Sequence, residues 1–233
     1  IADGNYWLRA NQYSFDSEIE FCKHLLLNKI TNQLTLIKEI KPTFYKKKSK
    51  TMHIKEFEIK VEKARKIDEL MGIEGALSKL YFQTIFKEYD WYKRMPRTKI
   101  DLNNLLLDIG YTFLFNFIDS LLRLHGFDTY KGIYHQLFFQ RKSLVCDLVE
   151  PFRCLIDKAL IKGYNLGQIN MDDFKKTKNG YVLKVDKQKK YLKIFSQAIM
   201  DKKEDIFVYV KQFYFCMLNG TKDFPIYEHK LSC

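Results

Sequence analysis

The stretch "DLNNLLLDIGYTFLFNFIDSLLRLHG", residues 101–126, contains the longest apolar segment of this 233-residue chain. Asp101 stands where a helix N-cap is expected, because its side chain can accept a backbone N–H of the first turn. The apolar run from Leu102 to Leu124 is long enough to be compared with a membrane span. Asp108 and Asp119 interrupt it, and charges of this kind argue against a span. The sequence therefore predicts a buried helix over 102–124 and no membrane segment.

The segments on either side of this helix are also predicted to be helical, from apolar residues at helical spacing and from Gly and Pro at the ends. The expected helices are 18–40 (stopped by Pro42), 53–70 (ended at Gly72), about 73–89, about 144–161, about 187–201 and about 204–219. "GYVLKV" (180–185) is the one convincing strand. The predicted fold class is all-α and multi-helical, with at most a small β-hairpin or a lone strand near 180–185.

The first dozen residues look extended and lead into a predicted helix start at 14–17. We therefore expect residues 1–14 to be a linker and 15–233 to form one helical domain. The sequence opens at Ile1 and shows no basic-then-apolar signal segment. Five cysteines without a C-x-x-C pair favour neither a disulfide framework nor a zinc knuckle, and a reducing cytoplasm fits them best.

The composition excludes a disordered chain, since 46% of the residues are hydrophobic and 15% are aromatic. A net charge of +12 indicates a polyanionic partner, with nucleic acid as the first expectation. Only 7 of the 40 basic residues are Arg, however, and such a lysine bias can also come from an AT-rich genome. The charge alone leaves both explanations open.

Two carboxylates three residues apart, Asp147 and Glu150, lie in "SLVCDLVEPFR" (143–153), downstream of His135. Residues at this spacing share a helix face. Pro151 removes an amide that would bond to the carbonyl of Asp147, which loosens the helix beside them. Arg153 could simply neutralise Glu150. On this segment alone a surface ion pair is favoured over a metal site, and both remain open.

A further carboxylate, Glu74, lies in "GIEGALSKLYF" (72–82), at a predicted helix start where the helix dipole favours negative charge. Gly75 inside a helix costs about 1 kcal/mol relative to Ala, a cost that close approach of backbone or ligand would explain. Glu74, His135 and Glu150 would make a set of two carboxylates and one imidazole. Such a set suits Mn²⁺ or Mg²⁺ better than a structural zinc.

Five motifs follow one another in order: "EGALSKLYF" (74–82), the loop Trp91–Arg97, "DLNNLLLDIGYTFL" (101–114), "GFDTYKGIYH" (126–135) and "SLVCDLVEPFR" (143–153). With "LRANQY" (8–13) and "KITNQLTLIK" (29–38), they closely resemble the CRISPR adaptation integrase family, the first universal CRISPR-associated protein. The resemblance spans roughly residues 8 to 160, and the tail from about 163 matches less clearly.

This resemblance implies an all-helical catalytic domain that inserts prespacer DNA into the CRISPR array by metal-dependent strand transfer. The family's metal ligands fall on Glu74, His135 and Glu150, and Asp147 matches an acidic neighbour that supports the site. Family members carry an N-terminal β-domain before the helical one, but only a dozen residues precede it here. That domain is therefore expected to be missing or shortened. In the family that domain usually mediates dimerisation and docks the second CRISPR adaptation protein, so the resemblance implies a homo-oligomer of the full-length form and that protein as a partner.

Prespacer DNA and the CRISPR array are the partners that the resemblance implies. The candidate DNA contacts are the polar and basic residues nearest the motifs: Arg94, Arg97, Lys99, Arg141 and, either for local structure or for DNA contact, Asn103. Lys79 is a weaker candidate, more typical of a solvated charge. Tyr81, Trp91 and Tyr111 could stack on splayed bases, although aromatics at helical spacing are more often core. Two alternative functions stay open: a metal-dependent nuclease on branched DNA and a catalytically silent DNA-binding scaffold.

Overall fold

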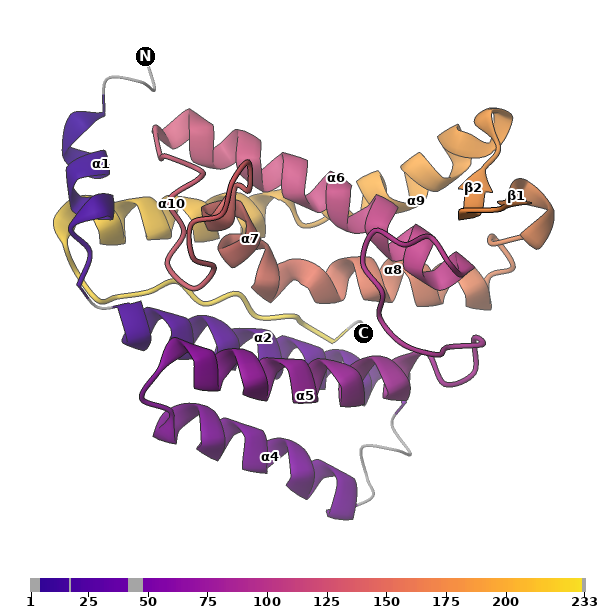
Figure 1. The fold of residues 1–233 in the computed structure, drawn as a ribbon, viewed down its shortest axis with the longest axis horizontal. Helices are drawn as coiled ribbons and strands as arrows, with labels where there is room; N and C mark the ends of the chain where they lie inside the picture. Colours follow the sequence, from indigo (N-terminus) through magenta and orange to yellow (C-terminus); the bar gives the residue numbers. More distant parts are fainter. Residues whose placement is uncertain (1–4, 17, 42–47, 232–233) are drawn as a thin grey trace.

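A computed structural model describes residues 5–16, 18–41 and 48–231, and the side chains of 56–231 within the last range (Figure 1). Its helices are α1 (Tyr6–Tyr13), α2 (Glu18–Ile40), α4 (Lys48–Lys63), α5 (Ile67–Ile85), α6 (Leu102–His125), α7 (Ser143–Val149), α8 (Arg153–Asn165), α9 (Gln188–Met200) and α10 (Lys203–Asn219). The strands β1 (Phe174–Thr177) and β2 (Gly180–Leu183) pair antiparallel as a hairpin, with Phe174 opposite Leu183. The predicted all-α class with one small hairpin is confirmed.

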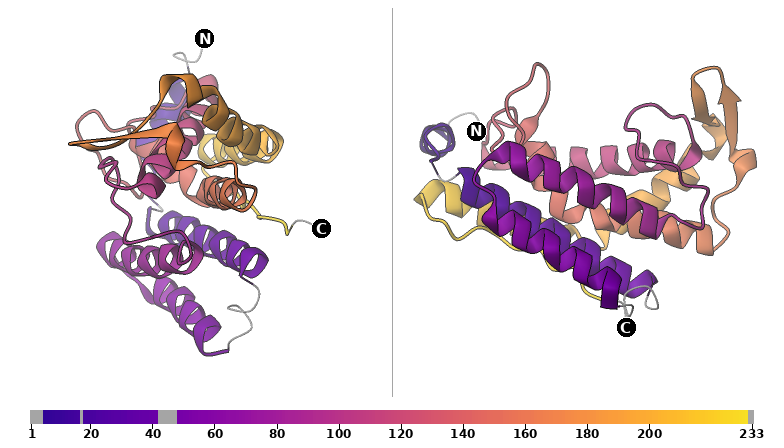
Figure 2. Two further views of the ribbon diagram at one scale, coloured as in Figure 1. Left: turned by 90° about the vertical axis from the view of Figure 1, so that its right-hand side faces the viewer. Right: turned by 60° about the horizontal axis from the view of Figure 1, so that its bottom comes forward.

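The helices form two layers (Figures 1 and 2). One layer holds α2, α4 and α5, and the other is built from α6 to α10 around α6. The C-terminal segment runs along α2 between the layers. Its backbone is tied to two buried amides of α2: Asn28 and Asn32 both donate to the carbonyl of Tyr227, at 2.7 and 2.9 Å.

The long helix α6 begins and ends as its sequence predicts. Asp101 accepts the N–H of Asn104 at 2.8 Å as the N-cap, and Gly126 ends the helix in the left-handed region at φ 89°. Within the part of the chain that the structure describes, α6 alone is long and apolar enough to cross a membrane. It packs instead against α7, α8, α9 and α10, and it is the core helix of the fold.

The predicted boundary between the second and third helices is wrong. The chain breaks at 64–66, and α5 runs on through Gly72 and Gly75. The buried stripe of α5 (Leu70, Leu77, Tyr81 and Ile85) packs against α2, and this burial outweighs the low helix propensity of glycine. A Cβ at Gly75 would meet nothing within 4 Å among the described residues, so no backbone of this chain approaches closely there, and the approach of a ligand stays a prediction. Glu74 therefore lies inside a helix rather than at its start.

Residues 6–13 were expected to be extended, and they form α1 instead. Asn5 caps the helix by accepting the N–H of Leu8 at 3.3 Å. Gln12, which is 1% exposed, donates to the carbonyls of Asp128 and Lys131 at 2.8 Å. These partners lie more than a hundred residues away along the chain, so no local pattern could indicate them. These hydrogen bonds pack α1 against the rest of the helical domain. Residues 1–4, Ser17 and Pro42, which also carry predictions, lie outside the described residues.

The predicted helix over 144–161 is present in two pieces. α7 ends at Val149, a 3₁₀ turn η2 (Glu150–Phe152) follows, and α8 continues from Arg153. Pro151 sits in this turn, where its missing N–H breaks the α-helical ladder as expected. The break leaves Glu150 at a bend that faces α2.

Candidate metal centre

A cleft of about 640 Å³ opens between the two layers, and Glu74, His135 and Glu150 all line it. The three come from α5, from the loop before α7 and from η2. Four cations line the same cleft: Lys29, Arg94, Arg97 and Arg153. The fold therefore gathers the three predicted ligands, 15 to 76 residues apart in sequence, at one basic surface.

Asp147 is the residue that positions His135. It is fully buried on α7, and its Oδ2 accepts the N–H groups of Ile133 and Tyr134 at 2.7 and 3.1 Å. Its Oδ1 lies 2.8 Å from the backbone nitrogen and 2.7 Å from the imidazole Nδ1 of His135. The loop can wrap this tightly because residue 132 is glycine: a Cβ there would stand 2.5 Å from the carbonyl oxygen of His135.

The hydrogen bond from Nδ1 sets the chemistry of the other ring nitrogen. Because Nδ1 donates to Asp147, a neutral imidazole carries its lone pair on Nε2, the form that binds metals. Within the described residues Nε2 makes no hydrogen bond. Burial would lower the pKa of His135, but the bond to Asp147 and the charges of Asp147, Glu150 and Glu74 raise it above its usual value.

Glu150 is 4% exposed and lies between two cations. Its Oε1 accepts the Nε–H of Arg153 at 2.9 Å, and its Oε2 lies 2.6 Å from Nζ of Lys29. Burial would raise the pKa of this carboxyl, but Arg153 and Lys29 hold it down at about 2. Arg153 pairs with Glu150, as one of the two interpretations of this segment expected, but the Glu150 side chain is only 4% exposed and that of Arg153 is 29% exposed.

Glu74 is held by two partners. One carboxylate oxygen pairs with the ammonium of Lys29, and the other accepts the hydroxyl of Tyr134 at 2.6 Å. Tyr134 is 1% exposed. Burial, followed by the charge of Glu74, raises the pKa of Tyr134 far above its usual value, so the phenol stays a donor. Tyr134 does not line the cleft but holds the carboxylate of Glu74 that does, and sequence reasoning found only Glu74.

Lys29 is the main residue that sequence reasoning missed. Its side chain on α2 is 6% exposed, and its Nζ contacts both Glu74 and Glu150. Burial would lower its pKa, but the two carboxylates raise it, so the ammonium stays charged. The available signal was its position three residues after Leu26 and four after Leu25, inside the buried stripe of α2. A lysine there is a buried charge that needs partners.

The donor set fits a hard divalent ion, with one obstacle. Two carboxylates and an imidazole Nε2 face one cleft, and oxygen with nitrogen ligands suits Mg²⁺ or Mn²⁺. In the described residues no three acidic, His or Cys side chains already stand at metal-binding spacing. The ammonium of Lys29 instead contacts both glutamates. The three residues would hold an ion only after that contact opens.

The candidate DNA-contact residues differ in their exposure and in the hydrogen bonds that they make within the protein. Arg97 and Lys99 are exposed, with left-handed backbone at φ 65° and 52°, in the loop before α6. The guanidinium of Arg94 is already hydrogen-bonded within the protein, because it donates to Asn104 at 2.8 Å and to Asp108 at 2.5 Å. Arg141 closes its own loop by donating to the carbonyl of Gln136 at 2.6 Å.

Asn103 is 3% exposed, and both ends of its amide are used inside the protein. It donates to the carbonyl of Tyr89 at 2.6 Å and accepts the hydroxyl of Tyr164 at 2.6 Å. Its contacts are those of a residue that orders local structure, and DNA cannot reach it in this state. Lys79 is exposed on α5 and does not line the cleft.

The three aromatic candidates are packed rather than presented to solvent. The hydroxyls of Tyr81 and Tyr111 both donate to the buried Asp157, at 2.7 and 2.5 Å. Trp91 stacks on Phe82 and Phe86, with ring centroids 5.3 and 5.1 Å apart. Their contacts are those of core residues.

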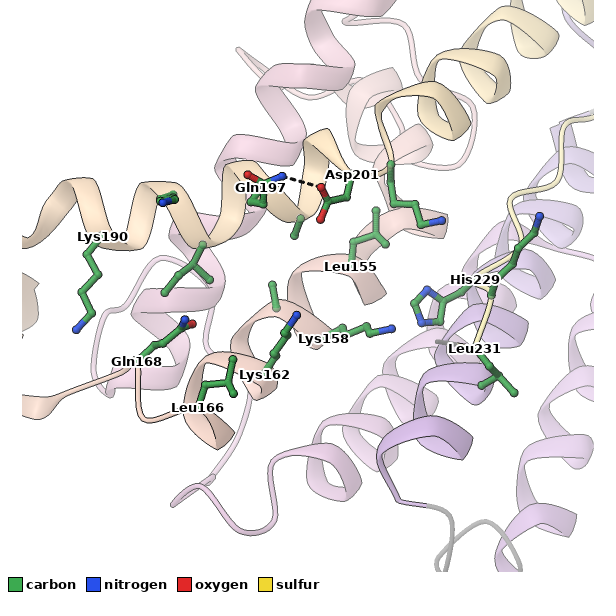
Figure 3. A pocket seen from close by; sticks show the side chains of 16 residues that line it. Leu155, Lys158, Lys162, Leu166, Gln168, Lys190, Gln197, Asp201, His229 and Leu231 are labelled. Atoms are coloured by element: carbon green, nitrogen blue, oxygen red, sulfur yellow. Dashed lines mark hydrogen bonds between the residues drawn. The ribbon is translucent and has the colours of Figure 1, made fainter. Parts of the chain in front are cut away.

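A second and larger cleft, of about 810 Å³, lies between α8, α9 and the C-terminal segment (Figure 3). Its rim is basic: Lys158, Lys162, Lys190, Lys193, Lys202 and Lys230. Asp201 is the one carboxylate among its lining residues, and it accepts the side-chain amide of Gln197 at 2.7 Å. This cleft lacks the paired carboxylates that a divalent cation needs, which separates it from the centre formed by Glu74, His135 and Glu150.

Comparison with known proteins gives a consistent result. The family model described as "CRISPR associated protein Cas1" matches residues 2–197. A CRISPR-associated endonuclease Cas1 of Thermodesulfovibrio yellowstonii is 32% identical over 85% of this chain and 67% of its own length. Another Cas1 relative, from Methanobrevibacter ruminantium, is 30% identical and is covered over 60% of its length. The chain thus spans about two thirds or less of these curated relatives.

Solved structures share the fold over nearly the whole chain. A casposase bound to an integration product superposes with a TM-score of 0.86 at 22% identity, covering 99% of this chain and 70% of that one. A chain of a Cas6-RT-Cas1–Cas2 complex gives a TM-score of 0.88 at 26% identity, covering 98% of this chain and 27% of that one.

Proposed function

The chain belongs to the Cas1 family of CRISPR-associated proteins, and we propose that it is a metal-dependent DNA integrase of CRISPR spacer acquisition. In this proposal it joins the 3′-hydroxyl ends of prespacer DNA to the CRISPR repeat by transesterification. The observation that carries the proposal is the convergence of Glu74, His135 and Glu150 on one cleft, with the imidazole oriented by a buried carboxylate. A surface ion pair would need no such orientation.

Strand transfer of this kind needs no protein nucleophile, because a DNA hydroxyl attacks a phosphodiester and the protein must align the groups and neutralise charge. A bound Mg²⁺ or Mn²⁺ would activate that hydroxyl and stabilise the leaving oxygen. Glu74, Glu150 and Nε2 of His135 would hold the ion. Asp147 keeps the imidazole in the metal-binding tautomer. The positive charge of Arg153 remains next to the ligands and favours an approaching phosphate.

The proposed partners are prespacer DNA and the CRISPR array. Arg97 and Lys99 are the candidate phosphate contacts, since they are exposed beside the cleft, and the net charge of +12 favours a polyanion. We extend the proposal to the second CRISPR adaptation protein as a partner and to a homo-oligomer of the full-length form. The support for the protein partner is the fold neighbour, which was solved in a complex with Cas2.

A second candidate function is hydrolysis without joining. Its support is the name of the relative from Thermodesulfovibrio yellowstonii, an endonuclease. The same three residues would serve both reactions, because water and a DNA hydroxyl are alternative attackers on the same phosphodiester. The catalytically silent scaffold is the third candidate, and the presence of all three ligands in one cleft argues against it.

The three candidates separate in one assay. A labelled duplex with 3′-hydroxyl ends is incubated with a supercoiled plasmid that carries the array, with Mn²⁺ present. The integrase gives label covalently joined to plasmid, and a duplex with 3′-deoxy ends gives none. A nuclease nicks the plasmid equally with both duplexes. A scaffold breaks no strand with either duplex. Glu150→Ala should abolish joining by an integrase, whereas in a scaffold the same substitution leaves the assay result unchanged.

A further inference from the structure

Lys29 occupies an unusual place in the cleft. Its ammonium group contacts a carboxylate from each side of the cleft, Glu74 of α5 and Glu150 of η2. The lysine side chain is 6% exposed, and that of Glu150 is 4% exposed. These two glutamates supply both carboxylates of the proposed metal site. The carboxylate oxygens of Glu74 and Glu150 thus have two candidate partners, the ammonium of Lys29 and a divalent metal ion.

The charges of the site explain why an internal cation is present. Moving a charged group from water into a protein interior costs several kcal/mol unless a partner of opposite charge is close. Glu150 has Arg153 as a second cation, but the ion pairs of Glu74 in the described residues involve Lys29 alone. Without Lys29 and without metal, the two carboxylates would face the same cleft, and Arg153 would pair with Glu150 but not with Glu74. The lysine offsets the repulsion between the two carboxylates.

A divalent ion and the ammonium cannot share this place. Mg²⁺ binds oxygen ligands at about 2.0–2.1 Å, whereas Nζ of Lys29 already lies 2.6 Å from Oε2 of Glu150 and also contacts Glu74. An ion that bound both carboxylates would stand against a like charge. Lys29 lines the cleft, so the cleft borders its side chain and is the space into which the ammonium would move.

We propose that Lys29 is an exchangeable internal cation: it neutralises Glu74 and Glu150 in the metal-free protein and must move into the cleft before the divalent ion binds. The inference rests on the proposed metal site. It makes Lys29 a positioning residue that sets the metal affinity, since part of the binding free energy is spent on its displacement. A lysine that merely cross-links α2 to its neighbours would leave the metal affinity unchanged.

The test is Lys29→Met, which keeps an unbranched side chain one atom shorter and removes the charge. The control is Lys23→Met on the same helix, where Nζ donates to the carbonyl of Glu62 outside the cleft. The Kd for Mn²⁺ is measured by isothermal titration calorimetry, and Tm is measured with and without Mn²⁺. We expect a lower Tm for metal-free Lys29→Met, and a Kd at least tenfold tighter than that of the wild-type protein. Mn²⁺ should also raise Tm by more than it does in the wild type. Lys23→Met should match the wild-type Kd.

Two results would overturn the inference. A Kd for Lys29→Met equal to or weaker than the wild-type Kd shows that no cation competes. If neither protein binds Mn²⁺, the proposed metal site fails, and the inference fails with it. Mn²⁺ binding to Lys29→Met alone would support the inference most strongly. Should the methionine variant not fold, Lys29→Gln carries the same comparison, because its neutral amide keeps a hydrogen-bond donor in the side chain and removes the charge.

Discussion

Asp147→Asn should remove two of the four hydrogen bonds by which Asp147 holds the loop before α7. Each carboxylate oxygen of Asp147 serves two donors: Oδ1 the backbone nitrogen and Nδ1 of His135, and Oδ2 the N–H groups of Ile133 and Tyr134. An asparagine presents one oxygen and one NH₂ group. In either orientation two bonds are lost, and the NH₂ group faces two donors.

Hydrogen bonds to charged groups contribute about 1.5–3 kcal/mol each. Two such losses give a decrease of about 3–6 kcal/mol in the free energy of unfolding, a large share of the 5–15 kcal/mol that is typical of domains. Urea unfolding followed by circular dichroism measures it. Asp205→Asn is the control, because Asp205 pairs with Lys202 at 3.1 Å with both side chains partly exposed, and exposed pairs contribute at most about 1 kcal/mol.

The same variant separates a positioning role from a ligand role. Partners that orient a metal ligand typically contribute 10–100-fold to metal affinity. Asp147→Asn should therefore weaken Mn²⁺ binding by that factor, and Glu150→Ala, which removes a ligand, should weaken it by more. An unfolding free energy within about 0.5 kcal/mol of wild type, or an Mn²⁺ affinity lowered as far as in Glu150→Ala, would refute the assignment of Asp147.

Three further predictions follow from other parts of the molecule. Gly75→Ala should raise the free energy of unfolding by about 1 kcal/mol in urea titrations, because the site is helical with open space around it; a loss of stability would contradict that geometry. Burial raises the pKa of Asp157 to about 6, although the hydroxyls of Tyr111 and Tyr81 lower it. Its folded pKa lies above the unfolded value of about 3.9, so its contribution to stability is present below pH ~4 and is lost as the pH rises through 6. The loss is about 3 kcal/mol, and the difference in stability between pH 4 and 7 should shrink in Asp157→Asn; an unchanged difference would refute it. DNA affinity should fall by orders of magnitude between about 50 and 200 mM salt if several phosphates are neutralised, and a flat affinity in filter binding would contradict an electrostatic interface.

Local signals in the sequence were enough for the elements whose ends are set by neighbouring residues. Asp101 and Gly126 define α6, and Pro151 marks the bend that presents Glu150. The boundary before α5 could not be predicted in this way. No Gly or Pro stands at 64–66, and Gly72 and Gly75 point to a break that packing against α2 overrides.

The residues of the candidate site also divide into those that the sequence indicated and those that it did not. Glu74, His135 and Glu150 were grouped as a ligand set by residue type and then matched to the family's motifs. Their sequence spacing did not predict that they meet, because the fold alone brings them to one cleft. Lys29 was not found, since its two partners lie 45 and 121 residues away in the sequence. The full burial of Asp147 was also hidden, because its donors belong to an irregular loop that no periodicity describes.

His135→Ala tests whether Glu74, His135 and Glu150 act together as one catalytic metal site. His24→Ala is the matched control, since His24 bonds to the carbonyl of Pro225 outside the cleft. Joining of a 3′-hydroxyl duplex to the array plasmid is measured with Mn²⁺, together with DNA affinity. We predict that His135→Ala abolishes joining and leaves DNA affinity within a few-fold of wild type, because phosphate contacts elsewhere persist. Full joining by His135→Ala would show that Glu74, His135 and Glu150 do not act as one catalytic metal site.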